Sequence, residues 1–338
     1  MGRGASNVTG LLAAGAVALS GGPAWAWGAT GHRLIGQAAM AALPVELPAF
    51  LRTPQASAEV IELSREPDRW RDSGRVHDSD RDGAHFLDLG ADGRIAGGPT
   101  LAALPPTRAA YAAALRAAGA DEIAEGYLPY AIVDGFQQLA KDFAYWRALK
   151  AAEARQADPE KRAWLQADRL RREGLLVRDL AVLAHYVGDA SQPLHVTASH
   201  DGWRGPNPQG FTTWRIHAPI EGAFVRANLT APMVQARLSP YRACACVIEA
   251  RTAAYLAATA SQVEPLYALE KIGGFRGADA RGVEFTAVRL AAGASELRDM
   301  ILDAWRAGGT MSVGYPVVSV AAIEAGEVDP YDSLYGLD

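Results

Sequence analysis

The residues most able to do chemistry in this 338-residue chain are histidines that stand beside carboxylates at helical spacing. His185 and Asp189 are four residues apart in AHYVGDASQPLH, and His217 and Glu221 are four apart in HAPIE. Side chains at this spacing share one face of a helix. An unpaired carboxylate on an apolar helix is costly, and a bound metal ion would remove that cost. Two such pairs, with His195 between them, predict a metal site, and buried salt bridges are the alternative.

The N-terminal half adds further candidate ligands. Trp27 and His32 lie in WGATGHRLIG, Asp68 and Arg71 lie in EPDRWRD, and His85 opens HFLDL. A free α-amine at Trp27, together with its carbonyl oxygen, can chelate a metal. That role requires cleavage of the chain immediately before Trp27.

Residues 1–26 have the pattern of a signal peptide. Arg3 precedes a short apolar run, LLAAGAVAL, and Ala24-Trp25-Ala26 supplies a small-x-small cleavage pattern. The run is too short for a comfortable membrane span. We therefore expect export to the periplasm or the medium, with cleavage near Ala26/Trp27, and a disordered or anchoring tail is the alternative.

The segments that must position these residues have the apolar periodicity of helices. Apolar residues recur at helical spacing over 132–143, residues 160–172 are typical of an exposed helix, and 174–190 are typical of a buried one. Residues 232–260 and 284–306 also favour helix. Segments 72–106 and 196–216 are rich in Gly, Pro, Asp and Asn and read as long loops. The sequence predicts one all-α domain over 27–306, and residues 307–338 form a tail with little helical pattern.

Bulk composition fits a globular protein with a large core. The chain is 49% hydrophobic and carries a formal net charge of −5, which argues against a strongly basic surface that coats nucleic acid. It does not exclude a nucleic-acid enzyme, because bound metal ions supply positive charge locally.

With these motifs in place, the chain resembles the class I zinc nucleases of plants and fungi, which are specific for single strands. The resemblance runs from Trp27 to about residue 306, and HYVGDASQPLH with the N-terminal WGxxGH carries it. It implies an all-α, multi-helix fold shared with bacterial zinc-dependent phospholipase C, in which long loops surround a cleft with three Zn²⁺ ions.

The resemblance also implies which residues bind which ion. One zinc would be held by Asp68, His85, His185 and Asp189, and a second by His195, His217 and Glu221. The third would take the amine and carbonyl of Trp27, His32 and a second oxygen of Asp189, which would bridge two metals.

The implied reaction is hydrolysis of a phosphodiester. A water bridging two zinc ions would supply hydroxide, because metal binding lowers its pKa from ~15.7 to roughly 7. Asp68 and Asp189 would orient or deprotonate that water, and Arg71 would contact the phosphate. Phe86 would stack on a nucleobase and Asp88 would hydrogen-bond to it.

The expected substrate is single-stranded DNA or RNA, with 3′-nucleotidase activity also possible. A base must leave its duplex stack to reach an aromatic side chain, for which Phe86, Trp203 and Trp214 are candidates. Core packing is the favoured alternative for both tryptophans. No organic cofactor and no stable protein partner are implied.

Two departures keep other functions open. Glu221 stands where the nucleases have Asp and the phospholipases have Glu, and 200–214 differs from the nuclease pattern. The spacings from Trp27 to His32 and from His195 to His217 are closer to the nucleases. A secreted phospholipase C acting on phospholipid is the alternative, and a non-catalytic zinc-binding protein of the envelope is a second one.

Four residues fall outside the predicted site. His77 lies among Asp78, Asp80 and Asp82 in a segment expected to be a solvated acidic loop, and His200 has no assigned role. Cys244 and Cys246 are separated by one residue, which is poor geometry for a disulfide. We expect both to be small buried apolar residues.

Overall fold

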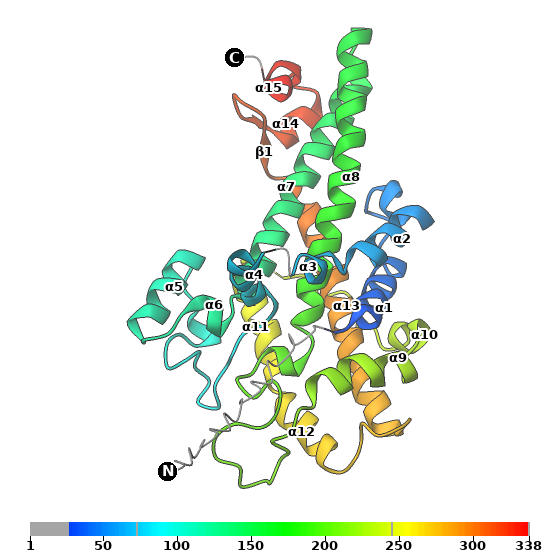
Figure 1. Ribbon diagram of the computed structural model, residues 1–338. Helices are drawn as coiled ribbons and strands as arrows, with labels where there is room; N and C mark the ends of the chain where they lie inside the picture. The colour runs from blue at the N-terminus through cyan, green and yellow to red at the C-terminus, as the bar shows by residue number, and fades with distance from the viewer. Residues whose placement is uncertain (1–26, 72–73, 245, 337–338) are drawn as a thin grey trace, which may run out of the picture.

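Three long helices lie side by side and carry the rest of the chain: α7 (Leu128–Arg155), α8 (Pro159–Asp189) and α13 (Ala280–Gly308) (Figure 1). The computed structural model describes residues 27–71, 74–244 and 246–336, and within these ranges the fold is all-α apart from one short hairpin. The expected signal peptide, residues 1–26, lies outside the described residues.

The pairing of α7 and α8 follows from local signals. Asp158 accepts hydrogen bonds from the Glu160 and Lys161 amides and so caps α8, and Pro159 occupies its first turn. Because only a short link separates the two helices, they run antiparallel. The two predicted stretches 160–172 and 174–190 form one continuous helix, whose last residue is Asp189.

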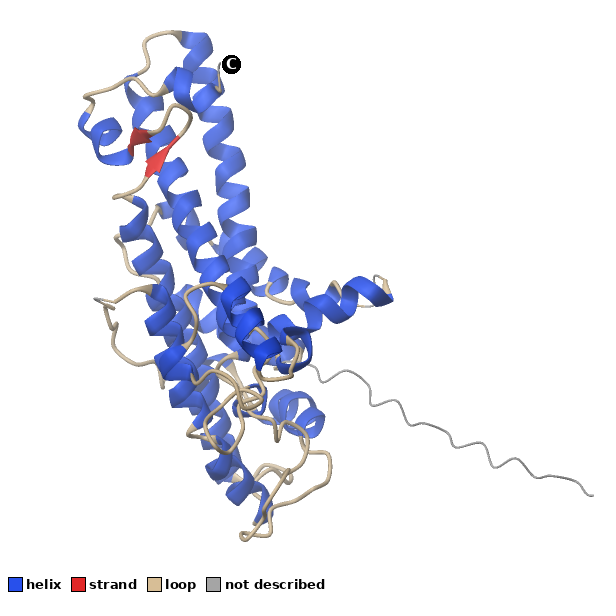
Figure 2. Ribbon diagram, turned by 90° about the vertical axis from the view of Figure 1, so that its left-hand side faces the viewer, coloured by secondary structure: helices blue, strands red, loops and turns tan. Residues whose placement is uncertain are grey.

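The first helices of the domain cover the C-terminal half of α8. Helix α1 (Ala29–Ala41) contacts α8 and α13 through buried residues that include Leu34 and Ile35, and α2 (Pro54–Leu63) contacts both α1 and α8. Gly188 permits this close approach, because a Cβ there would lie 3.1 Å from Nδ1 of His32. The loops gather at the end of the bundle where α8 finishes (Figure 2).

The remaining elements are short. The α-helices among them are α3 (Glu66–Arg69), α4 (Arg75–Asp82), α5 (Arg108–Ala117), α6 (Glu122–Glu125), α9 (Val225–Asn228), α10 (Ala231–Gln235), α11 (Ile248–Ala260), α12 (Val263–Lys271), α14 (Val320–Ala325) and α15 (Tyr331–Tyr335). Single 3₁₀ turns cover Ala49–Arg52, Gly83–His85, Leu101–Ala103 and Pro193–His195, and Pro219–Phe224 forms a π-helical turn. Strands β1 (Ser312–Val313) and β2 (Val318–Ser319) pair antiparallel.

Two predicted elements are wrong. Residues 232–260 are not one helix, because the chain between α10 and α11 is irregular, and Pro240 there removes an amide donor and disfavours helix before it. Residues 72–106 are not wholly a loop, since α4 is helical. The Tyr127 hydroxyl donates to the carbonyl of Asp80 at 2.7 Å and ties α4 to the start of α7.

The prediction of two buried cysteines is also wrong. Cys244 and Cys246 form a disulfide with a Cα–Cα distance of 5.0 Å, and Cys246 is exposed. The bond lies in the irregular chain between α10 and α11.

The segment after α13, whose helical pattern is weak in the sequence, packs on α7. Arg147 of α7 forms an ion pair with Glu324 of α14, with 2.9 Å between Nε and Oε1. Arg155 donates to the carbonyl of Ile323 at 2.8 Å and covers the C-terminal end of α14. Among the described residues, no helix is long and apolar enough to cross a membrane.

Candidate metal centre

The predicted side-chain ligands come from six separate segments of the chain and meet at the end of α8. Within the described residues, three buried groups place one ligand atom from each member within 4.8 Å of the others. They are His32, His185 and Asp189; Asp68, His85 and His185; and His195, His217 and Glu221. The groups that could hold metal are therefore the eight side chains predicted from the sequence.

Asp189 lies at the junction of the first two groups. Its Oδ1 is 3.4 Å from Nε2 of His32, and its Oδ2 is 3.3 Å from Nε2 of His185 and 3.1 Å from Nδ1 of His85. Asp68 approaches His185 at 3.9 Å. The two oxygens of Asp189 thus face different histidines, which is the arrangement that a bridging carboxylate requires.

The third group is built on a helical turn of unusual geometry. Pro219 stands in the first turn of the π-helical segment, and that turn presents Glu221 back toward His217. Oε2 of Glu221 lies 2.8 Å from Nε2 of His217 and 3.7 Å from Nε2 of His195. Single π-turns occur frequently at functional sites.

Backbone carbonyls fix the tautomers of two histidines. Nδ1 of His185 donates to the carbonyl of Ser64 at 2.8 Å, and Nδ1 of His195 donates to the carbonyl of His85 at 2.6 Å. A carbonyl only accepts, so each Nδ1 carries the proton and each Nε2 presents its lone pair to the carboxylates. This outer hydrogen bonding is typical of histidine metal ligands.

Nine of the candidate ligand atoms are buried and lack hydrogen-bond partners. They are both ring nitrogens of His32 and of His217, Nε2 of His195, Oδ1 of Asp68 and of Asp189, and both carboxylate oxygens of Glu221. Even the short contact between His217 and Glu221 lacks hydrogen-bond orientation. Converging lone pairs without donors are costly in a protein interior, and cations would satisfy them.

The pKa shifts of Glu221, His85 and His217 also favour a metal site. Burial raises the pKa of Glu221 to about 8, and it lowers the pKa of His85 to about 3 and that of His217 to about 4. Neutral imidazoles are the form that binds a metal. The buried carboxylate has no compensating cation among the described side chains, so the residues present fit a metal site.

Trp27 lies beside the first group. It is fully buried, and its indole nitrogen donates to the Ser191 hydroxyl at 2.8 Å, two residues beyond Asp189. A Cβ at Gly31 would come within 2.7 Å of the Trp27 Cβ, so glycine is needed where α1 passes this side chain. Metal binding by the Trp27 main chain stays a prediction.

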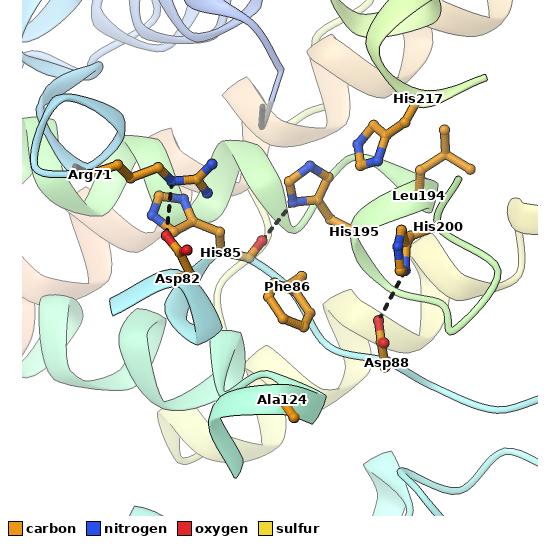
Figure 3. Close-up of a pocket in the computed structure, with 10 residues that line it drawn as sticks. All are labelled: Arg71, Asp82, His85, Phe86, Asp88, Ala124, Leu194, His195, His200 and His217. Atoms are coloured by element: carbon orange, nitrogen blue, oxygen red, sulfur yellow. Dashed lines mark hydrogen bonds and ion pairs between the residues drawn. The ribbon is translucent and has the colours of Figure 1, made fainter. Parts of the chain in front are cut away.

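A cavity of about 180 Å³ reaches two of the three groups, through His85 of one and His195 and His217 of the other. Arg71, Phe86 and Asp88, the predicted substrate contacts, all line it, together with His85 and His195 (Figure 3). The Arg71 side chain is largely buried, and its Nε lies 3.9 Å from Oδ1 of Asp68.

The structure adds three residues that sequence reasoning did not assign. Asp82 lies 3.3 Å from Nε of Arg71 and holds this arginine at the cavity. Oδ1 of Asp201 accepts from the backbone amides of Ile216 and His217, at 2.9 and 3.0 Å, and fixes the start of the π-helical turn. Ser191 is the acceptor for the indole of Trp27. No spacing rule identifies them, because each acts through the folded loop.

The two candidate tryptophans differ. Trp203 packs against Phe211 and Tyr267 and donates to the carbonyl of Pro206, so it anchors the loop. Trp214 is 82% exposed and is available for stacking. His77 lies within α4 rather than in a loop.

Comparison with known proteins assigns no family. No protein-family model matches this chain, and no curated protein matches it significantly.

Proposed function

We propose that this chain is an exported, zinc-dependent phosphodiester hydrolase that cleaves single-stranded DNA or RNA, with the fold of the zinc nuclease and phospholipase C type. The observation that carries the proposal is the clustering of three buried histidine–carboxylate groups, two of which reach a cavity that is also lined by Arg71 and Phe86. Nitrogen and carboxylate ligands without thiolate suit zinc, although other divalent ions compete for such sites.

In this proposal Asp68, His85, His185 and Asp189 hold one ion, and His195, His217 and Glu221 hold a second. A third takes His32, Asp189 and the main chain of Trp27 once residues 1–26 are removed. Bound zinc polarises phosphate oxygens and lowers the pKa of water.

The side chains of the cavity position the substrate. The guanidinium of Arg71 can donate two parallel N–H groups to the non-bridging oxygens of a phosphate. Asp82 and Asp68, whose carboxylates lie near its Nε, hold the guanidinium in place. Asp68 is further proposed to orient the attacking water by accepting a hydrogen bond from it. Phe86 offers its ring to an unstacked base, which is why single strands are favoured.

Arg71→Ala tests the enzymatic role. The variant should retain its zinc and lose about 10²–10³ in kcat on denatured DNA, the cost of removing one donor to a charged transition state. Arg69→Ala is the matched control, because Arg69 is half-exposed and is paired with Glu66 at the surface. A non-catalytic zinc-binding protein would show no hydrolysis of any phosphodiester in the zinc-loaded wild type.

A phospholipase C is the second candidate, and Glu221 is the observation that favours it, because the resemblance assigns Glu at this position to the phospholipases. Denatured DNA and phosphatidylcholine assayed side by side separate the two. The nuclease proposal expects digestion of the DNA and no release of diacylglycerol. The reverse result would overturn it.

A further inference from the structure

A second cavity, of about 350 Å³, lies between α7 and α8 and is separate from the one that reaches the metal groups. Its apolar wall consists of small residues, namely Ala84, Ala131, Gly135 and Val182. Gly135 lets the two helices approach closely, because a Cβ there would lie 3.2 Å from Cδ1 of Leu183. The polar wall is formed by Asp134, Gln138, Asp179, Tyr127 and Tyr186, and no basic side chain of the described residues lines this cavity.

One carboxylate of this wall has no counterion. Asp134 is exposed, and it forms neither an ion pair nor a hydrogen bond with any residue that the structure describes. Arg108 acts on it only at long range and is itself paired with Glu122 at 3.4 Å. Because an ionised carboxylate only accepts, Asp134 presents free acceptors to a cationic donor in the cavity.

The other end of the cavity also lacks donors. Oδ1 of Asp179 is paired with Nη1 of Arg178 at 2.6 Å, and Asp179 contacts the fully buried carboxyl group of Asp142. Oδ1 of Asp142 accepts from Arg172 at 2.6 Å and from Gln138 at 3.2 Å, whereas its Oδ2 has no partner among the described residues. Two carboxyl groups in contact, one of them with an unpartnered oxygen, favour a further cation at this end.

The two ends are separated by one to two helical turns. Gly135, next to Asp134, lies level with Leu183, and Asp179 lies one turn before Leu183 along α8. Asp142, which Asp179 contacts, lies two turns beyond Asp134 along α7. At 1.5 Å per residue these spacings are about 6 and about 12 Å. A ligand that satisfies both ends therefore needs two cationic groups joined by an apolar chain.

We infer that this groove is a binding site for a linear aliphatic polyamine, with one ammonium group at Asp134 and a second at Asp179. The methylene chain between them would lie against Ala131, Gly135 and Val182. An ammonium group has three donors and no acceptor, so it complements carboxylates that lack donors, and such charge-assisted hydrogen bonds are strong. A bare metal ion would leave most of the cavity and its apolar wall unfilled.

The groove is distinct from the metal centre, and the inference does not depend on the proposed function. Tyr186 stands between them, because it lines the groove while its ring packs edge-on against the rings of His85 and His185, with centroids 5.6 and 5.5 Å apart. An amine in the groove therefore does not reach the nitrogen atoms that would hold zinc.

Calorimetric titration of the zinc-loaded chain with putrescine, a linear diamine, tests the inference. We expect one equivalent to bind, roughly tenfold or more tightly than butylamine, which has the same chain and a single ammonium group. Asp134→Asn should reduce the affinity for putrescine to that for butylamine. This variant should fold, because Asp134 is exposed and has no partner to lose among the described residues.

Glu59→Gln is the matched control, because Glu59 is an exposed acid of α2 that does not line the groove. It should leave the affinity for putrescine unchanged. Ethylenediamine distinguishes the groove from direct chelation of zinc, since its chain is too short for the groove but ideal for a chelate. Ethylenediamine as the tightest ligand, equal binding of putrescine and butylamine, no binding, or a putrescine affinity that survives Asp134→Asn would overturn the inference.

Discussion

Replacing Asp201 with alanine should weaken one metal site and spare the other two. The carboxylate accepts hydrogen bonds from two consecutive amides, those of Ile216 and His217. It therefore sets the direction from which the His217 ring approaches His195 and Glu221. A hydrogen bond to a charged group contributes about 1.5–3 kcal/mol to the stability of the arrangement that it holds. Asp201 is 28% exposed, and water will replace part of that interaction in the variant.

The net loss is then about 1.4–2.8 kcal/mol, which is a tenfold to hundredfold weaker affinity for the ion bound by His195, His217 and Glu221. Outer hydrogen-bond partners of zinc ligands commonly have effects of this size. Chelator competition with a chromogenic dye resolves the ions by affinity. One equivalent should be released at lower chelator concentration than in the wild type, and the others should be unchanged.

Asp201→Asn is the control, since its amide oxygen can accept the same two hydrogen bonds. It should retain most of the affinity. Release of all ions together from Asp201→Ala, or no change in any of them, would refute the reasoning that the loop positions His217 independently of the groups around Asp189.

Three further outcomes are expected. Ser191→Ala leaves the buried indole nitrogen of Trp27 without an acceptor, and urea unfolding should show a loss of about 1–3 kcal/mol; an unchanged midpoint would contradict that contact. Burial and the neighbouring Asp179 raise the pKa of Asp142 to about 6, so the folded chain binds this proton more tightly than the unfolded chain does. Its stabilisation is therefore complete below about pH 4 and lost as the pH rises through 6, so Asp142→Asn should gain stability relative to the wild type between pH 4 and 7; parallel stability curves would contradict this. Trp214→Ala should raise KM about tenfold for oligonucleotides and leave KM for mononucleotides unchanged, because its exposed ring can stack only on a neighbouring base; equal effects on both substrates would exclude that role.

The side chains that could hold metal ions could be predicted from the sequence because their signal is local. A histidine and a carboxylate four residues apart share a helical face, and both pairs lie on helical turns in the structure. The helices themselves follow from apolar periodicity and from caps such as Asp158. The prediction failed over 232–260, where Pro240 interrupts a helical composition, and over 75–82, where tertiary contacts hold α4 in a charged segment.

The rest of the site depends on how loops close, which spacing does not encode. Asp82 lies beside Arg71 at the end of α4. His200 lies 3.7 Å from Asp88 because Tyr267 fixes the loop that carries His200. Such contacts join residues far apart in sequence, so no periodic pattern marks them. The cysteine pair shows the same limit, because the disulfide lies in irregular chain between α10 and α11, whose path no periodic pattern predicts.

The metal content of the chain that begins at Trp27 tests the central claim most directly. Inductively coupled plasma mass spectrometry of the purified protein should find about three zinc ions per chain, one for each buried group. A variant with one extra residue before Trp27 should selectively lose the ion assigned to His32. Fewer than two zinc ions per chain in the protein that begins at Trp27 would contradict the metal centre proposed here.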